Sequence, residues 1–129
     1  MNIPKPATQH MQFMQKDNLI CDVTFNIIED WVKFKNYSDD WSMLPFGTVP
    51  DTRVLPYKHL ERILEDYHCV PRTRAGIEEI LDMLQLEEYD PLMIVKRTNG
   101  VMMNSSVWIK FDDDDPSICW DVVRRAINM

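Results

Sequence analysis

The stretch Leu60-Glu-Arg-Ile-Leu-Glu-Asp-Tyr-His-Cys-Val-Pro-Arg-Thr-Arg74 joins two helical patterns. Before the break, apolar residues recur at the i, i+3, i+4 and i+7 spacing of an amphipathic helix. This spacing predicts a helix over residues 56–67, with Pro56 in its first turn. After the break, Thr73 can act as the N-cap of a second helix over residues 74–86. The two stripes consist of Leu60, Ile63, Leu64, Tyr67 and of Ile77, Ile80, Leu81, Leu84.

Two further helices are expected towards the C-terminus. Asp90-Pro91 is a capping residue followed by proline at the first helical position, and Asn99-Gly100 is typical of a helix end. We therefore predict a helix over residues 91–98. Asp115-Pro116 repeats the start signal and predicts a last helix, whose apolar stripe is Cys119, Val122, Val123, Ala126 and Ile127. Residues 107–111 alternate and fit either a strand or a turn packed on the core.

The N-terminal part has the period of β-structure. Alternating runs over residues 11–15 and 19–25 flank Lys16-Asp17-Asn18, which predicts a hairpin with a polar turn. A third strand is expected over residues 31–34, followed by a long loop over residues 35–56 that is rich in turn residues. The sequence thus predicts an α+β fold, with an N-terminal β-hairpin or small antiparallel sheet followed by a packed group of four helices.

Length and composition indicate one globular domain. The 129 residues carry a net charge of −7, and we expect a flexible N-terminus over residues 1–9 before a domain over residues 10–129. Three cysteines without CxxC spacing favour buried free thiols in a reducing cytoplasm. No apolar run is long enough for the core of a signal peptide or for a membrane span, so we expect a cytoplasmic protein without membrane association.

The chain carries no motif typical of catalysis. It has no GxSxG, HExxH, P-loop or GxGxxG pattern, so we expect a non-enzymatic protein without a cofactor. The run from Asp112 to Asp115 lacks the alternating ligands and central glycine of a calcium loop, so no metal site is expected there. A solvated loop in which Asp115 caps the last helix explains this run. Alternatively, Asp112, Asp113 and Asp114 form an acidic surface for a basic partner.

The candidate contact residues are arginines and aromatic residues in irregular segments. Arg72 and Arg74 precede a helix, where a phosphate or a partner's carboxylate could dock, although both could instead pair with nearby acids. Tyr37, Trp41 and Phe46 lie in the long loop, and we expect them to pin that loop to the core and to contribute to partner binding. The low isoelectric point and the acids of the second predicted helix argue against direct binding of duplex DNA.

Several short phrases of the chain resemble one protein family. They are Met14-Gln15-Lys16-Asp17-Asn18, Met43-Leu44-Pro45-Phe46-Gly47, Val70-Pro71-Arg72-Thr73-Arg74 and Trp108-Ile109. With these phrases the chain is similar to the region that precedes the kinase core in HipA-like proteins of Gram-positive bacteria, and to small stand-alone proteins that accompany such kinases. The resemblance implies a non-catalytic partner or regulator that docks on the kinase of a toxin–antitoxin-type system. Residues 110–129 have no counterpart in this family.

Two other interpretations stay open. An acidic inhibitor from a phage or mobile element could occupy the nucleic-acid-binding site of a defence effector, with Glu and Asp side chains as phosphate mimics. Such a contact would weaken strongly with salt, whereas an apolar interface would change little. The third interpretation is a homodimer anchored by exposed aromatic residues. The sequence leaves the oligomeric state and the direction of any regulatory effect open.

Overall fold

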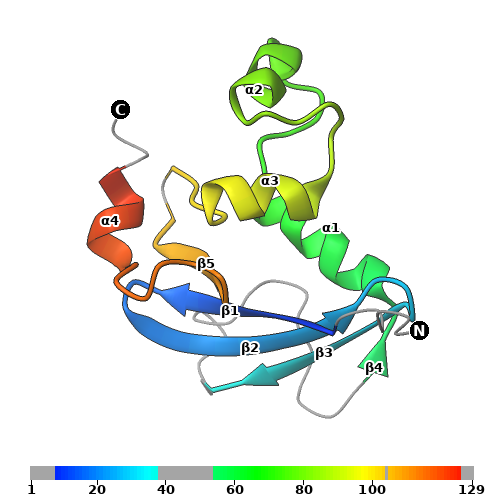
Figure 1. The fold of residues 1–129 in the computed structure, drawn as a ribbon, viewed down its shortest axis with the longest axis vertical. Helices are drawn as coiled ribbons and strands as arrows, with labels where there is room; N and C mark the ends of the chain where they lie inside the picture. Colours follow the sequence, from blue (N-terminus) through cyan, green and yellow to red (C-terminus); the bar gives the residue numbers. More distant parts are fainter. Residues whose placement is uncertain (1–7, 38–53, 104, 126–129) are drawn as a thin grey trace, which may run out of the picture.

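A computed structural model describes residues 8–37, 54–103 and 105–125 of the chain. These residues form a five-stranded antiparallel sheet in the order β4-β3-β2-β1-β5 (Figure 1). The strands are β1 (Gln9–Gln15), β2 (Asn18–Asn26), β3 (Trp31–Asn36), β4 (Val54–Leu55) and β5 (Val107–Phe111). The described helices are α1 (Tyr57–His68), α2 (Ile77–Met83), α3 (Pro91–Thr98) and α4 (Trp120–Arg125). The α+β fold is confirmed.

The helices lie on one side of the sheet. Figure 1 shows α1 and α3 over one face, α2 beyond α3 and farther from the sheet, and α4 beside the turn between β1 and β2. The core lies between the sheet and the α1–α3 layer, where Phe13, Phe25, Leu60, Leu64 and Val95 are fully buried. The opposite face of β2 and β3 is not packed against any described helix (Figure 1).

The predicted hairpin is confirmed as β1 and β2. Lys16 adopts a φ of 52° in its turn, and Gln15 pairs with Asn18. As strand alternation requires, Met11 and Phe13 are buried while Gln12 between them is only half-buried. An irregularity between Phe13 and Met14 shifts the register. Gln9 belongs to β1, so the strand begins inside the N-terminal segment that was predicted to be flexible; residues 1–7 lie outside the described part.

Pairing with β1 makes residues 107–111 a strand. Phe13 faces Ile109 and Met14 faces Trp108 in the antiparallel β1–β5 ladder. The buried Trp108 indole donates its Nε1 proton to the carbonyl oxygen of Lys16 at 2.6 Å. The sequence pattern of residues 107–111 fits either a strand or a turn. The long-range pairing with β1 makes this segment a strand.

Two helix starts are fixed by carboxylates. Asp90 is the N-cap of α3 and accepts hydrogen bonds from the backbone N–H groups of Leu92 and Met93, as predicted. Asn99 ends α3 in the left-handed conformation with a φ of 56°, so both predicted bounds of this helix are confirmed. For α1 the carboxylate comes from another element, because Asp30 in the β2–β3 loop accepts a hydrogen bond from the Tyr57 N–H at 3.1 Å.

Two predicted caps are wrong. The second helix begins at Ile77 rather than Arg74, because Gly76 precedes it with a left-handed φ of 79° that no right-handed helix contains. Thr73 therefore lies in a turn and does not cap α2. Asp115 does not cap α4 either: its carboxylate accepts hydrogen bonds from the N–H and hydroxyl of Ser117, and α4 begins only at Trp120.

The predicted long loop is shorter than expected. Its first two residues, Lys35 and Asn36, belong to β3, and Val54–Leu55 pair with β3 as the edge strand β4. Trp41 and Phe46 lie outside the described residues. Within the described segments, no helix has the length and apolar character that crossing a membrane requires.

Candidate functional site

A cavity of about 630 Å³ lies on the helical side of the molecule. Its walls come from the α1–α2 connection, the C-terminal ends of α2 and α3, the segment after α3, and α4. Most of the lining is apolar, and two of its large apolar side chains, Met103 and Val122, are exposed to solvent. Methionines adapt their shape to a ligand more readily than branched side chains do. The apolar lining includes Val70, Leu84, Met102, Met103, Ile118 and Val122.

Two arginines, Arg74 and Arg97, belong to the same lining. Arg74 comes from the α1–α2 connection and Arg97 from the last turn of α3. Both are exposed, and neither side chain forms an ion pair or a hydrogen bond within the described part of the chain. The cavity therefore combines apolar walls with two positive charges that no described acid neutralises.

Arg72, by contrast, is held by its own chain. Its Nη2 lies 2.6 Å from Glu65 Oε1, and its guanidinium stacks on the Tyr89 ring at 4.4 Å from the ring centroid. The Tyr89 hydroxyl in turn donates to the carbonyl oxygen of Val70 at 2.6 Å. Pairing with a nearby acid is thus confirmed for Arg72 but not for Arg74. The two arginines that the sequence grouped together have different environments.

The acidic run after β5 is mostly bound within the chain. Asp114 accepts hydrogen bonds from Asn99 Nδ2 and from the Phe111 N–H, both at 2.8 Å, while Asp115 binds Ser117. Asp112 contacts His10, as described below. Asp113 is exposed, with no partner among the described residues. Only part of the predicted acidic surface is therefore available to a partner.

A second group of polar side chains lies on the outer face of the sheet. His10 in β1 bridges two carboxylates, with its Nε2 2.7 Å from Asp22 Oδ1 and its Nδ1 2.7 Å from Asp112 Oδ1. The Tyr37 hydroxyl donates to the other Asp22 oxygen at 2.6 Å, and Gln12 donates to Asp22 at 3.3 Å. We refer to His10, Gln12, Asp22, Tyr37 and Asp112 as the His10 cluster.

The charges of the His10 cluster shift its titration. Partial burial opposes protonation of His10, but the hydrogen bonds and negative charges of Asp112 and Asp22 outweigh it and raise its pKa. Burial likewise opposes ionisation of Asp22, yet hydrogen bonds from Tyr37, His10 and Gln12 lower its pKa. Both pKa shifts favour a protonated His10 imidazole beside an ionised Asp22 carboxylate.

The predicted site residues that the structure describes therefore do not form one site. Tyr37 and Asp112 belong to the His10 cluster on the outer sheet face, whereas Arg72 and Arg74 lie in the connection between α1 and α2. No feature of the sequence singled out Arg97, which lies in the last turn of α3. Nor did the sequence single out His10 with Asp22, since these residues meet only through the β1–β2 register.

The residues that could suggest thiol chemistry are part of the core. His68 and Cys69 are buried, and the His68 Nδ1 lies 3.1 Å from the carbonyl oxygen of Gly100. Burial raises the pKa of the Cys69 thiol to about 12, so this group is neutral near pH 7. Among the residues that the structure describes, no three His, Cys, Asp or Glu side chains are arranged to hold a metal ion.

Comparison of the chain with protein-family models, with curated proteins and with solved structures found no match. A functional assignment therefore depends on the cavity, the His10 cluster and the short sequence phrases. Of these, the cavity with Arg74 and Arg97 offers the most space for a ligand together with uncompensated charge.

Proposed function

We propose that this protein is a non-catalytic protein-binding module whose partner inserts an apolar segment with an acidic group into the Arg74–Arg97 cavity. The single observation that carries the proposal is the pair of arginines without described acidic partners in a largely apolar cavity of about 630 Å³. Apolar walls supply affinity when they lose contact with water, while the guanidinium groups select a carboxylate or phosphate by forked hydrogen bonds.

The negative net charge of the protein limits the kind of partner that it can bind. An acidic protein repels most acidic surfaces at long range, so a partner must offer its negative group close to the arginines and be neutral or basic elsewhere. Arginine and exposed apolar side chains are enriched at the centres of protein interfaces, and Met103 and Val122 supply the exposed apolar component here. A flexible partner segment with an apolar side chain next to Asp, Glu or a chain terminus meets these requirements.

The resemblance described above suggests a HipA-like kinase as this partner. Its phrases include residues 70–74, which contribute Val70, Pro71 and Arg74 to the cavity lining. We therefore propose that the protein docks on such a kinase as a partner or regulator in a toxin–antitoxin-type system.

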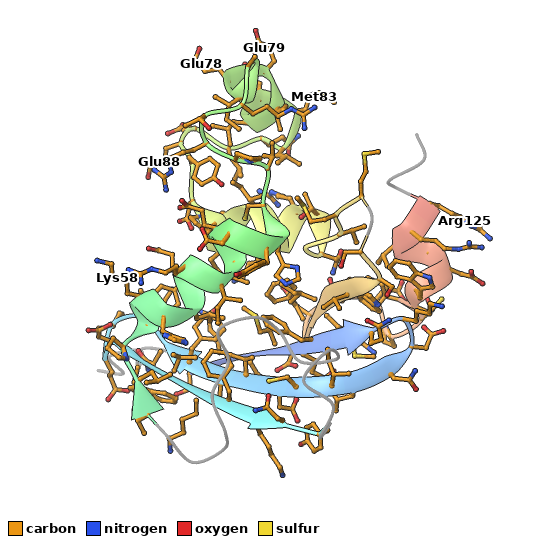
Figure 2. The ribbon with its side chains drawn as sticks, turned by 180° about the vertical axis from the view of Figure 1, so that it is seen from behind. Lys58, Glu78, Glu79, Met83, Glu88 and Arg125 are labelled. Carbon is orange, nitrogen blue, oxygen red and sulfur yellow. The ribbon has the colours of Figure 1, made fainter. Side chains whose placement is uncertain are left out.

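The test is direct binding to a purified HipA-like kinase from the native host by titration calorimetry. We expect an affinity in the micromolar range or tighter, and the double variant Arg74→Gln/Arg97→Gln should weaken it at least about tenfold. The matched control is Lys58→Gln/Arg62→Gln, which removes the same charge from the exposed surface of α1. Figure 2 shows Lys58 on the side of the molecule opposite to Arg125 of α4.

The outcomes test separately the two parts of the proposal, the kinase as the partner and the Arg74–Arg97 cavity as the docking site. Binding that both double variants weaken equally would contradict the cavity as the docking site and leave the kinase as partner. No binding to the kinase, together with capture of a different protein that needs Arg74 and Arg97, would contradict the kinase and support the cavity. No arginine-dependent partner in either experiment would contradict both parts.

The same protein and its arginine variants also test the alternative function, that of an acidic inhibitor. Figure 2 shows Glu78 and Glu79 at the end of the molecule farthest from the sheet, with Glu88 on the same side. These three carboxylates are exposed and form no ion pair within the described segments. An inhibitor of this kind would bind a nucleic-acid-binding effector at low salt, lose it at high salt, and depend on Glu78 and Glu79 but not on the arginines.

A further inference from the structure

The outer face of β3 carries two lysine side chains flanked by two aromatic side chains. Trp31, Lys33 and Lys35 occupy alternate positions of the strand, and Tyr37 follows at the next such position. Val32 and Phe34 between them are buried in the core, so the alternate side chains face away from α1. Lys33, Lys35 and Tyr37 are exposed and Trp31 is half-buried, which leaves the series accessible.

This face is hollowed rather than flat. A cavity of about 480 Å³ lies against Lys33, Lys35 and Tyr37, and it extends across β2 to Thr24 and His10. The ladder brings these residues side by side, since Lys33 pairs with Thr24, which in turn pairs with His10. Among the described elements, no helix covers this part of the sheet (Figure 1).

The local charge of the hollow differs from that of the whole protein. Lys33 and Lys35 form no ion pair with any acid in the described ranges, and each ammonium lies near an aromatic ring, 5.8 Å from Trp31 and 5.2 Å from Tyr37. The carboxylate in the lining, Asp22, is already bound to His10, Tyr37 and Gln12. The positive charges are therefore available to an anionic ligand, while this negative charge is compensated.

We infer that the outer face of β3 binds single-stranded nucleic acid, with bases stacked on Tyr37 and Trp31 and phosphates held by Lys33 and Lys35. Sheet faces that combine exposed aromatic rings with cations bind unpaired strands in this way. Alternate residues of a strand repeat every roughly 7 Å, so the series forms an extended array that suits a polymer better than a single anion. In a duplex the bases are already stacked on one another, so their faces are closed to Tyr37 and Trp31.

The proposed surface is separate from the Arg74–Arg97 cavity, and the two proposals can fail independently. The net charge of −7 opposes a polyanion at long range. Binding should therefore be weak, and because among the described residues of this face only Lys33 and Lys35 are placed to hold phosphates, the affinity should fall only several-fold as salt rises from about 50 to about 200 mM.

The experiment is fluorescence anisotropy with labelled single strands of about 12 nucleotides, oligouridine and oligothymidine, against the full-length protein. Salt is varied between about 50 and about 200 mM, and a duplex of the same length is the reference. The charge variant is Lys33→Gln/Lys35→Gln, with Lys58→Gln/Arg62→Gln as the control of equal charge. Tyr37→Phe and Tyr37→Ala separate loss of the Asp22 hydrogen bond from loss of the ring.

We expect saturable binding of the single strands and at least about tenfold weaker binding by the lysine variant and by Tyr37→Ala. Tyr37→Phe, which keeps the ring, should bind more tightly than Tyr37→Ala, and the control variant Lys58→Gln/Arg62→Gln should bind as the wild type does. The inference is overturned if no single strand binds below about 100 µM at low salt, if the duplex binds equally well, or if the control variant loses as much affinity as the lysine variant. It is also overturned if an oligoglutamate peptide binds as tightly and with the same variant profile, which would identify a general surface for acidic proteins.

Discussion

Asp114 and Asn99 are joined by a hydrogen bond of 2.8 Å between Asp114 Oδ2 and Asn99 Nδ2. The bond connects the loop after β5 to the C-terminal end of α3, and Asn99 Nδ2 also donates to the carbonyl oxygen of Ile109. Asn99 lines the candidate cavity. The Asn99 side chain thus links the acidic run, strand β5 and the proposed binding site.

Replacing Asp114 should destabilise the fold more than replacing its neighbour. Asp114→Ala removes the acceptor of the Asn99 side chain and of the Phe111 N–H, and we expect a loss of about 1–3 kcal/mol in the free energy of unfolding. Asp113→Ala removes the same charge from an exposed position without a described partner, so its effect should stay within about 0.5 kcal/mol. Urea unfolding of both variants measures the difference, and equal losses would contradict this role of Asp114.

The two described glycines with positive φ should respond differently to alanine. Gly100 has a φ of 64°, and an added Cβ would lie 2.9 Å from Ile109 Cδ1 and 3.2 Å from Ile109 Cγ1. Gly76 has a φ of 79°, but its nearest neighbour would be the flexible end of Glu79 at 3.5 Å. Gly76→Ala should therefore cost about 1–2 kcal/mol from backbone strain alone, and Gly100→Ala at least about 1 kcal/mol more from overlap. Thermal and urea unfolding would contradict this account if Gly76→Ala were the more damaging change.

The His10 cluster predicts a specific dependence of stability on pH. Because the folded pKa of His10 is raised from 6.5, its stabilising contribution is complete below pH 6.5 and is lost as the pH rises through the folded pKa. His10→Gln should therefore lower stability more at about pH 5.5 than at about pH 8.5, relative to the wild type. The pKa of Asp22 is lowered, so its contribution persists until the pH falls below its usual value of 3.8.

His68 has the opposite effect on the pH dependence of stability. Burial lowers its pKa from 6.5, so the folded state resists protonation and loses stability as the pH falls below that value. In the His10→Gln variant this loss is no longer offset, and stability should fall more steeply between about pH 8 and about pH 5.5 than in the wild type. Unfolding curves at several pH values test both statements, and a constant difference between variant and wild type would contradict them.

The cysteines should differ in reactivity. Cys21 and Cys69 are buried and Cys119 is half-buried, and all three are free thiols. Because burial also raises the pKa of Cys69 to about 12, little reactive thiolate forms there near pH 7. In the native protein, Ellman's reagent should modify Cys119 first and the other two only on unfolding. Fast modification of Cys69 in the folded state would contradict its burial.

Short-range signals predicted much of the fold. The bounds of α3 follow from Asp90, Pro91 and Asn99, which act on groups only a few residues away. The hairpin follows from alternation on both sides of Lys16. The predicted start at Arg74 failed because it depended on Thr73 as the N-cap, whereas the left-handed conformation of Gly76 delays the start of α2 to Ile77.

The candidate sites were harder to predict from the sequence than the fold. Arg74 was recognised because two arginines near a predicted helix start suggest an anion site, but its separation from Arg72 depends on Glu65 and Tyr89. The partners of His10 lie 12 and 102 residues away along the chain. Nothing local to His10 predicts either contact.

By itself, the sequence determined the α+β class, the hairpin and the helix at residues 91–98, because periodicity and capping act over a few residues. Burial was expected for all three thiols and is confirmed for Cys21 and Cys69, whereas Cys119 is only half-buried. Tertiary structure alone decided that residues 107–111 pair with β1, that Asp30 supports the start of α1, and that Arg97 joins Arg74 in one cavity. These outcomes depend on strand register and on the packing of helices over the sheet. Both arise from contacts between segments far apart in the chain, which no local pattern encodes.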